Sequence, residues 1–214
     1  MLGMKQVYPG RYEPDMLVKL WREEKVTFSH CVPTILQMLL NCPTAQGQDF
    51  AGWKIIIGGS SLNRSLYQAA LARGIQLTAA YGMSETCPLI GAAHLNDELQ
   101  AGSEDERVTY RIKAGVPVPL VEAAIVDGEG NFLPADGETQ GELVLRAPWL
   151  TMGYFKEPEK SQELWQGGWL HTGDVATLDG MGYIDIRDRI KDVIKTGGEW
   201  VSSLDLEDLI SRHP

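Results

Sequence analysis

Residues 53–81 read WKIIIGGSSLNRSLYQAALARGIQLTAAY, and the order of patterns in this stretch decides the fold class. An apolar run stops at two glycines, a segment with apolar residues at helical spacing follows, and a second apolar run ends at Tyr81. Strand, helix and strand in this order are typical of parallel strands joined by a right-handed crossover. We therefore predict strands over residues 53–59 and 75–81, with a helix over 64–73 between them.

The residues before this stretch repeat the same alternation. EPDMLVKLWREE (13–24) carries Pro14 near its start, where a helix tolerates proline, and its apolar residues recur at helical spacing. VTFSHCV (26–32) is typical of a strand, and PTILQMLLN (33–41) is typical of a helix. The first hundred residues thus predict an α/β layer built on a parallel sheet.

From about residue 108 the pattern changes to short strands separated by turn residues. VEAAIVDGEGNFL (121–133), QGELVLRA (140–147) and VATLDGMGYIDI (175–186) contain strand-like runs, and DGEGN and DGMG are turn signals. They predict an antiparallel sheet or a small barrel. A charge-dense stretch, RDRIKDVIK (187–195), comes next.

A helical pattern, SSLDLEDLI, occupies residues 202–210. These changes of pattern divide the chain into three predicted segments. The α/β portion covers residues 1–107, the antiparallel portion 108–189, and the start of a further domain 190–214.

Composition limits the classes of protein to which the chain can belong. Its formal net charge of −10 argues against a nucleic-acid binder, which needs a basic face. The three scattered cysteines, Cys31, Cys42 and Cys87, predict buried free thiols in a reducing cytoplasm rather than disulfides or a zinc site. We find no apolar run of about 18 residues that would cross a membrane.

The stretch TAAYGMSETC (78–87) places a carboxylate between two hydroxyls at the end of a predicted strand. One interpretation is structural, with Ser84 as a helix N-cap. The other is a ligand site, because ligands of open α/β sheets bind beyond the carboxyl ends of the strands, and Ser84 beside Glu85 suits phosphate with Mg²⁺. The stretch by itself leaves both interpretations open.

Four stretches together carry a resemblance to a known family: IIGGSSL (56–62), YGMSET (81–86), GGWLHTGD (167–174) and DRIKDVIKTGGEWVS (188–202). In this order they resemble the adenylate-forming acyl-CoA synthetase superfamily, and they look most like bacterial medium-chain fatty-acid–CoA ligases. The resemblance covers essentially all 214 residues. It implies the later part of the large adenylating domain, with a parallel βαβ portion, then a small antiparallel β-barrel-like subdomain and the start of the small C-terminal domain.

The resemblance also implies a middle fragment. The family's loop rich in Ser, Thr and Gly that ends in Pro-Lys-Gly has no counterpart here, and the family's catalytic lysine would fall beyond Pro214. We therefore expect a part of an ATP-dependent fatty-acid–CoA ligase that is inactive alone and self-associates through an unpaired sheet edge. Two alternatives stay open: a non-catalytic nucleotide- or acyl-binding module, and an acyl-AMP ligase that serves a carrier protein.

The implied reaction joins a fatty acid to ATP as acyl-AMP and then transfers the acyl group to CoA, with Mg²⁺ as cofactor. By resemblance, Ser84 would bind the α-phosphate and Glu85 the Mg²⁺. Asp174 would accept both ribose hydroxyls, since a carboxylate has two oxygens for the two donors of a cis-diol. Arg189 would reach the ribose or the phosphates. For Asp174 the alternative is an ordinary surface turn.

The resemblance implies further nucleotide contacts at two glycine-containing turns. The residues concerned are Gly58, Gly59, Ser60, Ser61, Ala79, Tyr81 and Gly82. Backbone at the first turn would pack against adenine and Tyr81 would cover the other face, because glycine permits close approach. A turn capped by Ser60 or Ser61 is the structural alternative.

Later residues are implied in the second half-reaction. Lys191 falls at the family's hinge position, Lys195 would lie near acyl-AMP, and Gly197 and Gly198 would form the wall of the pantetheine tunnel. A solvated charged face is the alternative interpretation of this stretch.

The acyl channel is implied by small and apolar residues, which are equally compatible with ordinary core: Val32, Pro33, Thr34, Ala79, Ala80 and Ile90. His30 is interpreted as structural, and neither His94 nor His171 has the spacing of a metal site.

Overall fold

A computed structural model of the chain describes residues 3–192, 194–196, 199–201 and 210. The chain forms two compact units, Met1–Thr78 and Ala79–Pro214. The boundary predicted between residues 107 and 108 falls instead inside a helix, α5 (Glu104–Arg111). We placed that boundary where the sequence pattern changes to short strands. This change comes later in the chain than the boundary between the two compact units.

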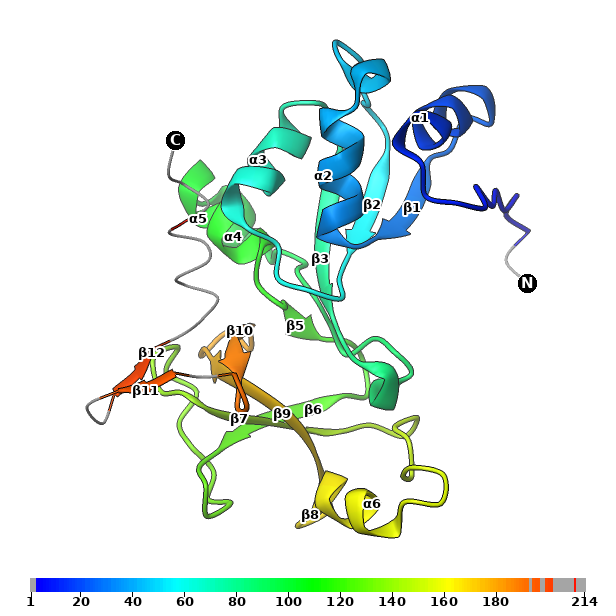
Figure 1. The fold of residues 1–214 in the computed structure, drawn as a ribbon. Coiled ribbons are helices and arrows are strands. Elements are labelled where there is room, and N and C mark those ends of the chain that lie inside the picture. Colours follow the sequence, from blue (N-terminus) through cyan, green and yellow to red (C-terminus); the bar gives the residue numbers. More distant parts are fainter. Residues whose placement is uncertain (1–2, 193, 197–198, 202–209, 211–214) are drawn as a thin grey trace. The chain divides into compact units, whose positions relative to one another are not determined.

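The first unit is the α/β layer that the alternation predicted (Figure 1). Strands β1 and β2 are parallel, with Phe28 opposite Lys54 and Cys31 opposite Ile57, and β3 begins beside β2. The elements in chain order are α1 (Pro14–Glu23), β1 (Phe28–Cys31), α2 (Pro33–Asn41), η1 (Pro43–Ala45), β2 (Lys54–Ile57), α3 (Arg64–Leu71) and β3 (Gln76–Tyr81).

The first helices begin where their sequences place proline. Pro14 and Pro33 open α1 and α2, where the missing N–H has no intrahelical partner to lose. The cap of α3 was predicted at Ser60 or Ser61, and this is wrong. Asn63 is the N-cap, and its side chain accepts a hydrogen bond from the Leu66 amide at 2.8 Å. Asn63 stands next to the helix, whereas the serines precede it by two residues or more and are exposed.

The core of the first unit combines buried aliphatic side chains of α2, β2 and β3 with an aromatic cluster. The ring of Trp21 lies edge-on to Phe50, with centroids 4.8 Å apart, and stacks on Trp53 at 5.9 Å. Such pairs stabilise a core beyond their buried area. This cluster ties α1 to the segment that leads into β2.

The second unit begins with the end of β3, and here the parallel pattern stops. Ala80 and Tyr81 of β3 pair antiparallel with β4 (Gly91–Ala92), which pairs antiparallel with β5 (Val116–Pro117). Two helices follow β4 that the sequence patterns did not predict, α4 (Asp97–Ala101) and α5. Both are short, so few apolar positions mark their period, although Asn96 and Ser103 cap them.

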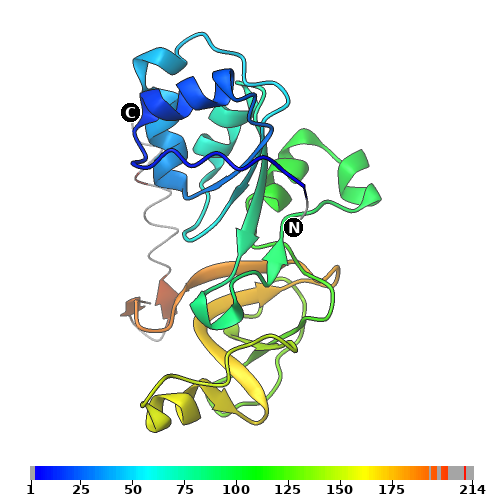
Figure 2. The ribbon, with the colours of Figure 1, turned by 90° about the vertical axis from the view of Figure 1, so that its right-hand side faces the viewer.

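The rest of the second unit is the predicted antiparallel sheet, seen from another side in Figure 2. Its strand order is β10-β9-β7-β6, and β8 pairs with β9. Among the described residues no ladder joins β6 to β10, so the sheet is open. Its elements are β6 (Glu122–Val126), β7 (Gly141–Arg146), α6 (Pro158–Leu164), β8 (Trp165–Gln166), β9 (Trp169–Leu178) and β10 (Ile184–Arg189).

Both predicted turn signals form turns of this sheet. Asp127 accepts hydrogen bonds from the amides of Glu129 and Asn131, and Asp179 accepts from those of Met181 and Tyr183. An aspartate that bonds the backbone two residues ahead is the usual way in which such turns are fixed. The second of these turns joins β9 to β10.

A small hairpin, β11 (Ile194–Thr196) with β12 (Glu199–Val201), follows β10. Of the helix predicted over 202–210, residues 202–209 lie outside the described residues. In the described part of the chain, no helix has the length and apolar character needed to span a membrane.

Candidate active site

Strand β9 carries a bulge at the HTGD segment. Glu142 of β7 lies opposite Val175, and Val144 lies opposite His171. Between these pairs β7 advances by two residues while β9 advances by four, which leaves two extra residues in β9. A bulge of this kind redirects a side chain out of the regular alternation. The side chain at the bulge is that of Asp174.

Asp174 joins two other predicted residues in the second unit. The residue is only 5% exposed, and Tyr81 at the end of β3 donates its hydroxyl to Oδ2 of Asp174 at 2.6 Å. Arg189, at the end of β10, places Nε 3.3 Å from Oδ1. Three of the residues implied in nucleotide binding therefore lie in contact, although Tyr81 and Asp174 are 93 positions apart in the chain.

Burial governs the electrostatics of this group. It raises the pKa of Asp174, while the hydrogen bond from Tyr81 and the charge of Arg189 oppose the rise. Burial, with the charge of Asp174 as the next cause, also raises the pKa of Tyr81, so its hydroxyl stays a donor at neutral pH. Among the described residues, Tyr81 contacts one carboxylate oxygen and Arg189 the other, so each oxygen keeps a further lone pair as acceptor.

The turn after β3 shows why the sequence reads Gly82 there. A Cβ atom at Gly82 would lie 1.6 Å from the carbonyl oxygen of Pro88, so no larger residue fits without moving the backbone. Thr86, which is fully buried, accepts a hydrogen bond from the Met83 amide at 2.9 Å and donates to the Pro88 carbonyl at 2.7 Å. The turn itself thus requires glycine at this position, and the nucleotide contact of Gly82 stays a prediction.

Ser84 and Glu85 lie in the short helix η2 (Ser84–Thr86). Its N-cap position is Met83, and Thr86 satisfies that amide, so the interpretation of Ser84 as a cap is wrong. Ser84 is exposed, which leaves its hydroxyl accessible. An N-cap is the residue before the first helical residue, and here Ser84 is itself the first residue of the helix. The helix thus begins one residue earlier than the sequence suggested.

Glu85 is held by a residue that the sequence did not indicate. Tyr154 donates its hydroxyl to Glu85 Oε1 at 2.6 Å, and the amide of Thr151 donates to the Glu85 carbonyl at 2.9 Å. The hydrogen bond to Glu85 is the main reason that the pKa of Tyr154 rises to about 12. No local sequence pattern predicts this contact, because 69 positions separate the two residues.

No three His, Cys, Asp or Glu side chains gather as a metal site among the described residues. One carboxylate, that of Glu85, fits Mg²⁺ when the ion takes its other ligands from phosphates and water. His171 lies instead 2.8 Å from Glu142, through Nδ1 and Oε2.

The glycine turn of the first unit follows β2. Gly58 is buried, whereas Gly59, Ser60 and Ser61 are exposed. Gly59 has φ +86°, and a Cβ there would lie 3.2 Å from Val32 Cγ1. This turn therefore needs glycine for its backbone conformation.

The residues suggested for an acyl channel differ in their surroundings. Ile90 is fully buried in the core of the second unit with Leu143 and Leu145, which favours the interpretation as core. Ala79 is buried and Ala80 half-buried in β3. In the first unit, Val32 and Thr34 are exposed and Pro33 is half-buried at the start of α2.

Of the residues implied in the second half-reaction, two lie within the described residues and two do not. Lys191 is exposed two residues after the end of β10, in a turn where the amide of Asp192 donates to the Arg189 carbonyl at 2.9 Å. Lys195 is a residue of β11, opposite Trp200. Gly197 and Gly198 lie outside the described residues.

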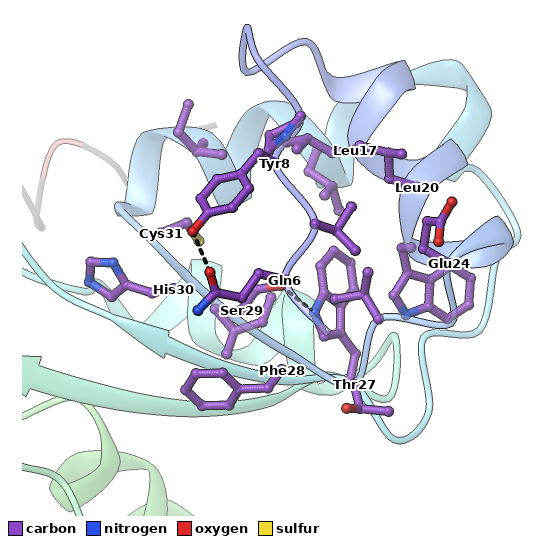
Figure 3. A pocket seen from close by; sticks show the side chains of 18 of the residues that line it. Gln6, Tyr8, Leu17, Leu20, Glu24, Thr27, Phe28, Ser29, His30 and Cys31 are labelled. Carbon is purple, nitrogen blue, oxygen red and sulfur yellow. Dashed lines mark hydrogen bonds between the residues drawn. The ribbon is translucent and has the colours of Figure 1, made fainter. Parts of the chain in front are cut away.

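A cavity of about 730 Å³ lies in the first unit (Figure 3). Side chains of the N-terminal segment, α1 and β1 line it, including Tyr8, Leu17, Leu20 and Phe28. None of the residues assigned to the nucleotide is among its lining, so it is not part of the predicted site.

The cysteines are free, and their exposure differs from the prediction of buried thiols. Cys42 is buried, Cys31 is half-buried beside the cavity, and Cys87 is exposed in the turn after η2. Burial raises the pKa of Cys31 to about 11. Sequence spacing carries no information about the exposure of a thiol in a turn.

Known proteins resemble this chain over its whole length. A long-chain-fatty-acid–CoA ligase of Thermus thermophilus is 39% identical over 217 residues, which is 100% of this chain and 40% of that protein. A 3-methylmercaptopropionyl-CoA ligase of Ruegeria lacuscaerulensis is 42% identical over 221 residues, again 100% of this chain and 40% of the relative. The chain thus spans two fifths of the length of these curated relatives.

Solved structures share the fold. The o-succinylbenzoate-CoA synthetase of Bacillus subtilis, in complex with ATP and magnesium, has a TM-score of 0.76 and 26% sequence identity, over 95% of this chain and 40% of that one. The family described as AMP-binding enzyme matches residues 1–155, which is more than half of the 214. The resemblance that the four sequence stretches carried is confirmed, and the chain belongs to the AMP-binding enzyme family.

Proposed function

We propose that the whole protein is an ATP-dependent ligase that joins a fatty acid to CoA through acyl-AMP. The observation that carries this proposal is the group of Tyr81, Asp174 and Arg189, which three strands bring together in a member of the AMP-binding family. A buried carboxylate with spare acceptor capacity beside a cation suits a sugar diol next to phosphate.

In the first half-reaction the substrate carboxylate attacks the α-phosphate of ATP, so two anions must approach each other. Asp174 accepts the ribose hydroxyls and thereby fixes the nucleotide, while Tyr81 keeps that carboxylate in place by its hydrogen bond. Arg189 supplies positive charge on the same side. The exposed hydroxyl of Ser84 binds the α-phosphate. Catalysis of this kind rests on positioning and on electrostatic stabilisation.

Glu85 holds Mg²⁺ in this proposal, and bound Mg²⁺ would offset the charge of the phosphates. Tyr154 restricts the Glu85 side chain through its hydrogen bond, so the carboxylate is aligned before substrate arrives. The solved relative from Bacillus subtilis, which contains ATP and magnesium, supports this cofactor for the family fold. That Ala79, Gly82 and residues 58–61 contact the nucleotide remains a prediction from the resemblance.

The second half-reaction transfers the acyl group to CoA. We assign Lys191 to the hinge because it is exposed and lies two residues after the end of β10, where a solvated side chain tolerates a change of backbone angles. Lys195 near acyl-AMP, and Gly197 and Gly198 along the pantetheine, complete this assignment. An acyl-AMP ligase that serves a carrier protein remains the nearest alternative, and a free CoA product distinguishes the two.

For the acid we propose saturated chains of roughly six to twelve carbons, on the resemblance to medium-chain ligases and the small residues Ala79 and Ala80. Affinity should rise with chain length until the channel ends, since each buried CH₂ contributes about 0.8 kcal/mol. The Thermus relative is named for long-chain acids, and the Ruegeria relative for a short sulfur-containing acid.

We also place the protein in the cytoplasm, in agreement with its free cysteines.

The test is a comparison of the two half-reactions in the full-length protein. We expect pyrophosphate exchange that depends on a fatty acid, and acyl-CoA formation once CoA is added. Exchange without any thioester would favour the carrier-protein alternative. An absence of exchange with every acid from acetate to palmitate would contradict the ligase and favour a non-catalytic nucleotide-binding module.

A further inference from the structure

The bulge in β9 is held from one neighbouring side chain, that of Glu142 in β7. Glu142 Oε1 accepts a hydrogen bond from the amide of Gly173 at 3.0 Å, and Oε2 lies 2.8 Å from His171 Nδ1. The two oxygens of one carboxylate thus contact the bulge on both sides of Thr172. Because an ionised carboxylate only accepts hydrogen bonds, Nδ1 of His171 is the donor.

The remaining contacts of the bulge lead from this carboxylate to Asp174. Thr172 donates its hydroxyl to the Leu143 carbonyl at 2.7 Å and accepts from the Asp174 amide at 3.1 Å. Gly173 has φ +70°, and its carbonyl accepts from the Ile190 amide at 2.9 Å. Gly173, the residue before Asp174, is therefore fixed at its amide by Glu142 and at its carbonyl by Ile190, the residue that follows β10.

Placing Glu142 here has an electrostatic drawback. Its charge raises the pKa of Asp174, so the two carboxylates repel each other. Both oxygens of Glu142 are nevertheless engaged with the bulge, and its side chain is only 20% exposed. Glu142 therefore lies beside Asp174 in spite of this repulsion, and both of its oxygens hold the backbone and side chain of the bulge. We take this as a sign that Glu142 sets the conformation of the bulge.

We propose that Glu142 is a positioning residue, which aims Asp174 at the ribose by clamping Gly173 and His171. This inference rests on the proposed function for the identity of the ligand. The clamp itself stands on the contacts above. Glu142 touches no nucleotide in this scheme, and it acts only through the conformation of residues 171–174.

Three variants distinguish the effect of the two Glu142 contacts from the effects of its negative charge and its side-chain volume. Glu142→Ala removes both contacts. Glu142→Gln keeps an acceptor for Gly173 and offers an N–H to His171 Nδ1 in the other tautomer. Glu122→Ala, at an exposed position of β6 in the same sheet, is the matched control for loss of one negative charge.

The first measurement is amide hydrogen exchange at residues 171–175 in the full-length protein. We expect Glu142→Ala to exchange at least about tenfold faster there, with Glu142→Gln and Glu122→Ala close to wild type. Unchanged exchange in Glu142→Ala would overturn the clamp. This measurement needs no catalysis, so it decides the clamp even if the protein is not a ligase.

The second measurement is the preference for ATP over 2′,3′-dideoxy-ATP in pyrophosphate exchange. A displaced aspartate loses the diol, so Glu142→Ala should reduce this preference by roughly 10–100-fold, with the KM for the acid unchanged. Glu142→Gln should restore it to within about threefold of wild type, because both hydrogen bonds are kept. In an Asp174→Ala background, Glu142→Ala should have no further effect on the preference.

The outcomes are distinguishable. A wild-type protein without pyrophosphate exchange would refute the ligase function, and hydrogen exchange would then decide the clamp. A wild type that prefers ATP, with that preference intact in Glu142→Ala, would refute the positioning role. Equal losses in Glu142→Ala and in the charge control Glu122→Ala would also refute it, because they would reflect net charge.

Discussion

Asp174 illustrates how a residue can be recognised in a sequence while its environment cannot. The HTGD segment pointed to Asp174 as a binding residue, and the structure places it against Tyr81 and Arg189, which the same resemblance had selected. The groups that hold the site were not recognised. Tyr154 and Glu142 act through contacts distant in sequence, and neither has a local pattern that distinguishes it from an ordinary strand or loop residue.

Replacement of Asp174 by alanine should nearly abolish adenylation in the full-length protein. Two charge-assisted hydrogen bonds to ribose, at roughly 1.5–3 kcal/mol each, correspond to a loss on the order of 10²–10⁴-fold in rate. Fatty-acid-dependent pyrophosphate exchange is the measurement. A rate within about tenfold of wild type would contradict the ribose assignment.

The raised pKa of Asp174 also predicts a pH dependence of stability. Because the folded-state pKa lies above the unfolded one, ionisation of Asp174 weakens the folded state as pH rises from about 4 through the folded-state pKa. Relative to Asp174→Asn, the wild type should therefore lose free energy of unfolding over this interval. Denaturant titrations of both proteins from acid to neutral pH measure it. A difference that grows in favour of the wild type would show that Arg189 outweighs burial.

The turn at Gly82 gives a prediction about stability alone. Gly82→Ala brings a Cβ against the Pro88 carbonyl and should lower the free energy of unfolding by about 2–4 kcal/mol, as backbone overpacking does. Gly128→Ala is the control, since a Cβ there meets nothing within 4 Å. Similar unfolding midpoints for both variants would mean that the turn relaxes without loss.

At the scale of elements, segments with several apolar residues were predicted, and very short or mostly polar segments were not. The bounds of α2 agree with the prediction, and the predicted strands and helices of residues 53–81 all form. The strands β4, β5 and β8 were missed because two residues show no alternation. The helices α4, α5 and α6 were missed because each is mostly polar and has a single buried residue, so no apolar period shows. The sequence also did not predict that β4 runs antiparallel to β3, because nothing in the two residues of β4 indicates the direction of the strand.

The exposed position after β10 leads to a prediction about the two half-reactions. Lys191→Pro in the full-length protein should spare acyl-AMP formation far more than thioester formation, because only the second step requires rotation at the hinge. Pyrophosphate exchange and acyl-CoA production, measured separately, test this. Equal losses in both would remove the hinge role from Lys191.

At the scale of the whole molecule, the chain spans 40% of the length of its curated relatives. The sequence resemblance predicts that the family's triphosphate loop is not among these 214 residues. Tyr81, Arg189 and Tyr154, the described side chains that contact Asp174 and Glu85, lie within the second unit.

We expect that the 214 residues alone do not turn over. Loss of one preorganised donor costs about 10²–10³ in rate, and several would be lacking together. We also expect self-association through an unpaired sheet edge. An ATP- and CoA-dependent assay with light scattering checks both. Thioester formation at the rate of an intact ligase would contradict the first expectation, and a monomer at all concentrations would contradict the second.

The two extra residues of β9 have a consequence for how such a site can arise or disappear. Side chains in a strand alternate between faces with a period of two, so an insertion of two residues leaves every residue before and after it on its original face. Leu170 and Ala176 remain in the core on either side of the bulge. Deletion of Gly173 and Asp174 would therefore remove the aspartate and leave the hydrophobic pattern of β9 intact. A single two-residue insertion or deletion can thus add or remove this buried carboxylate without changing which side chains of the sheet face the core.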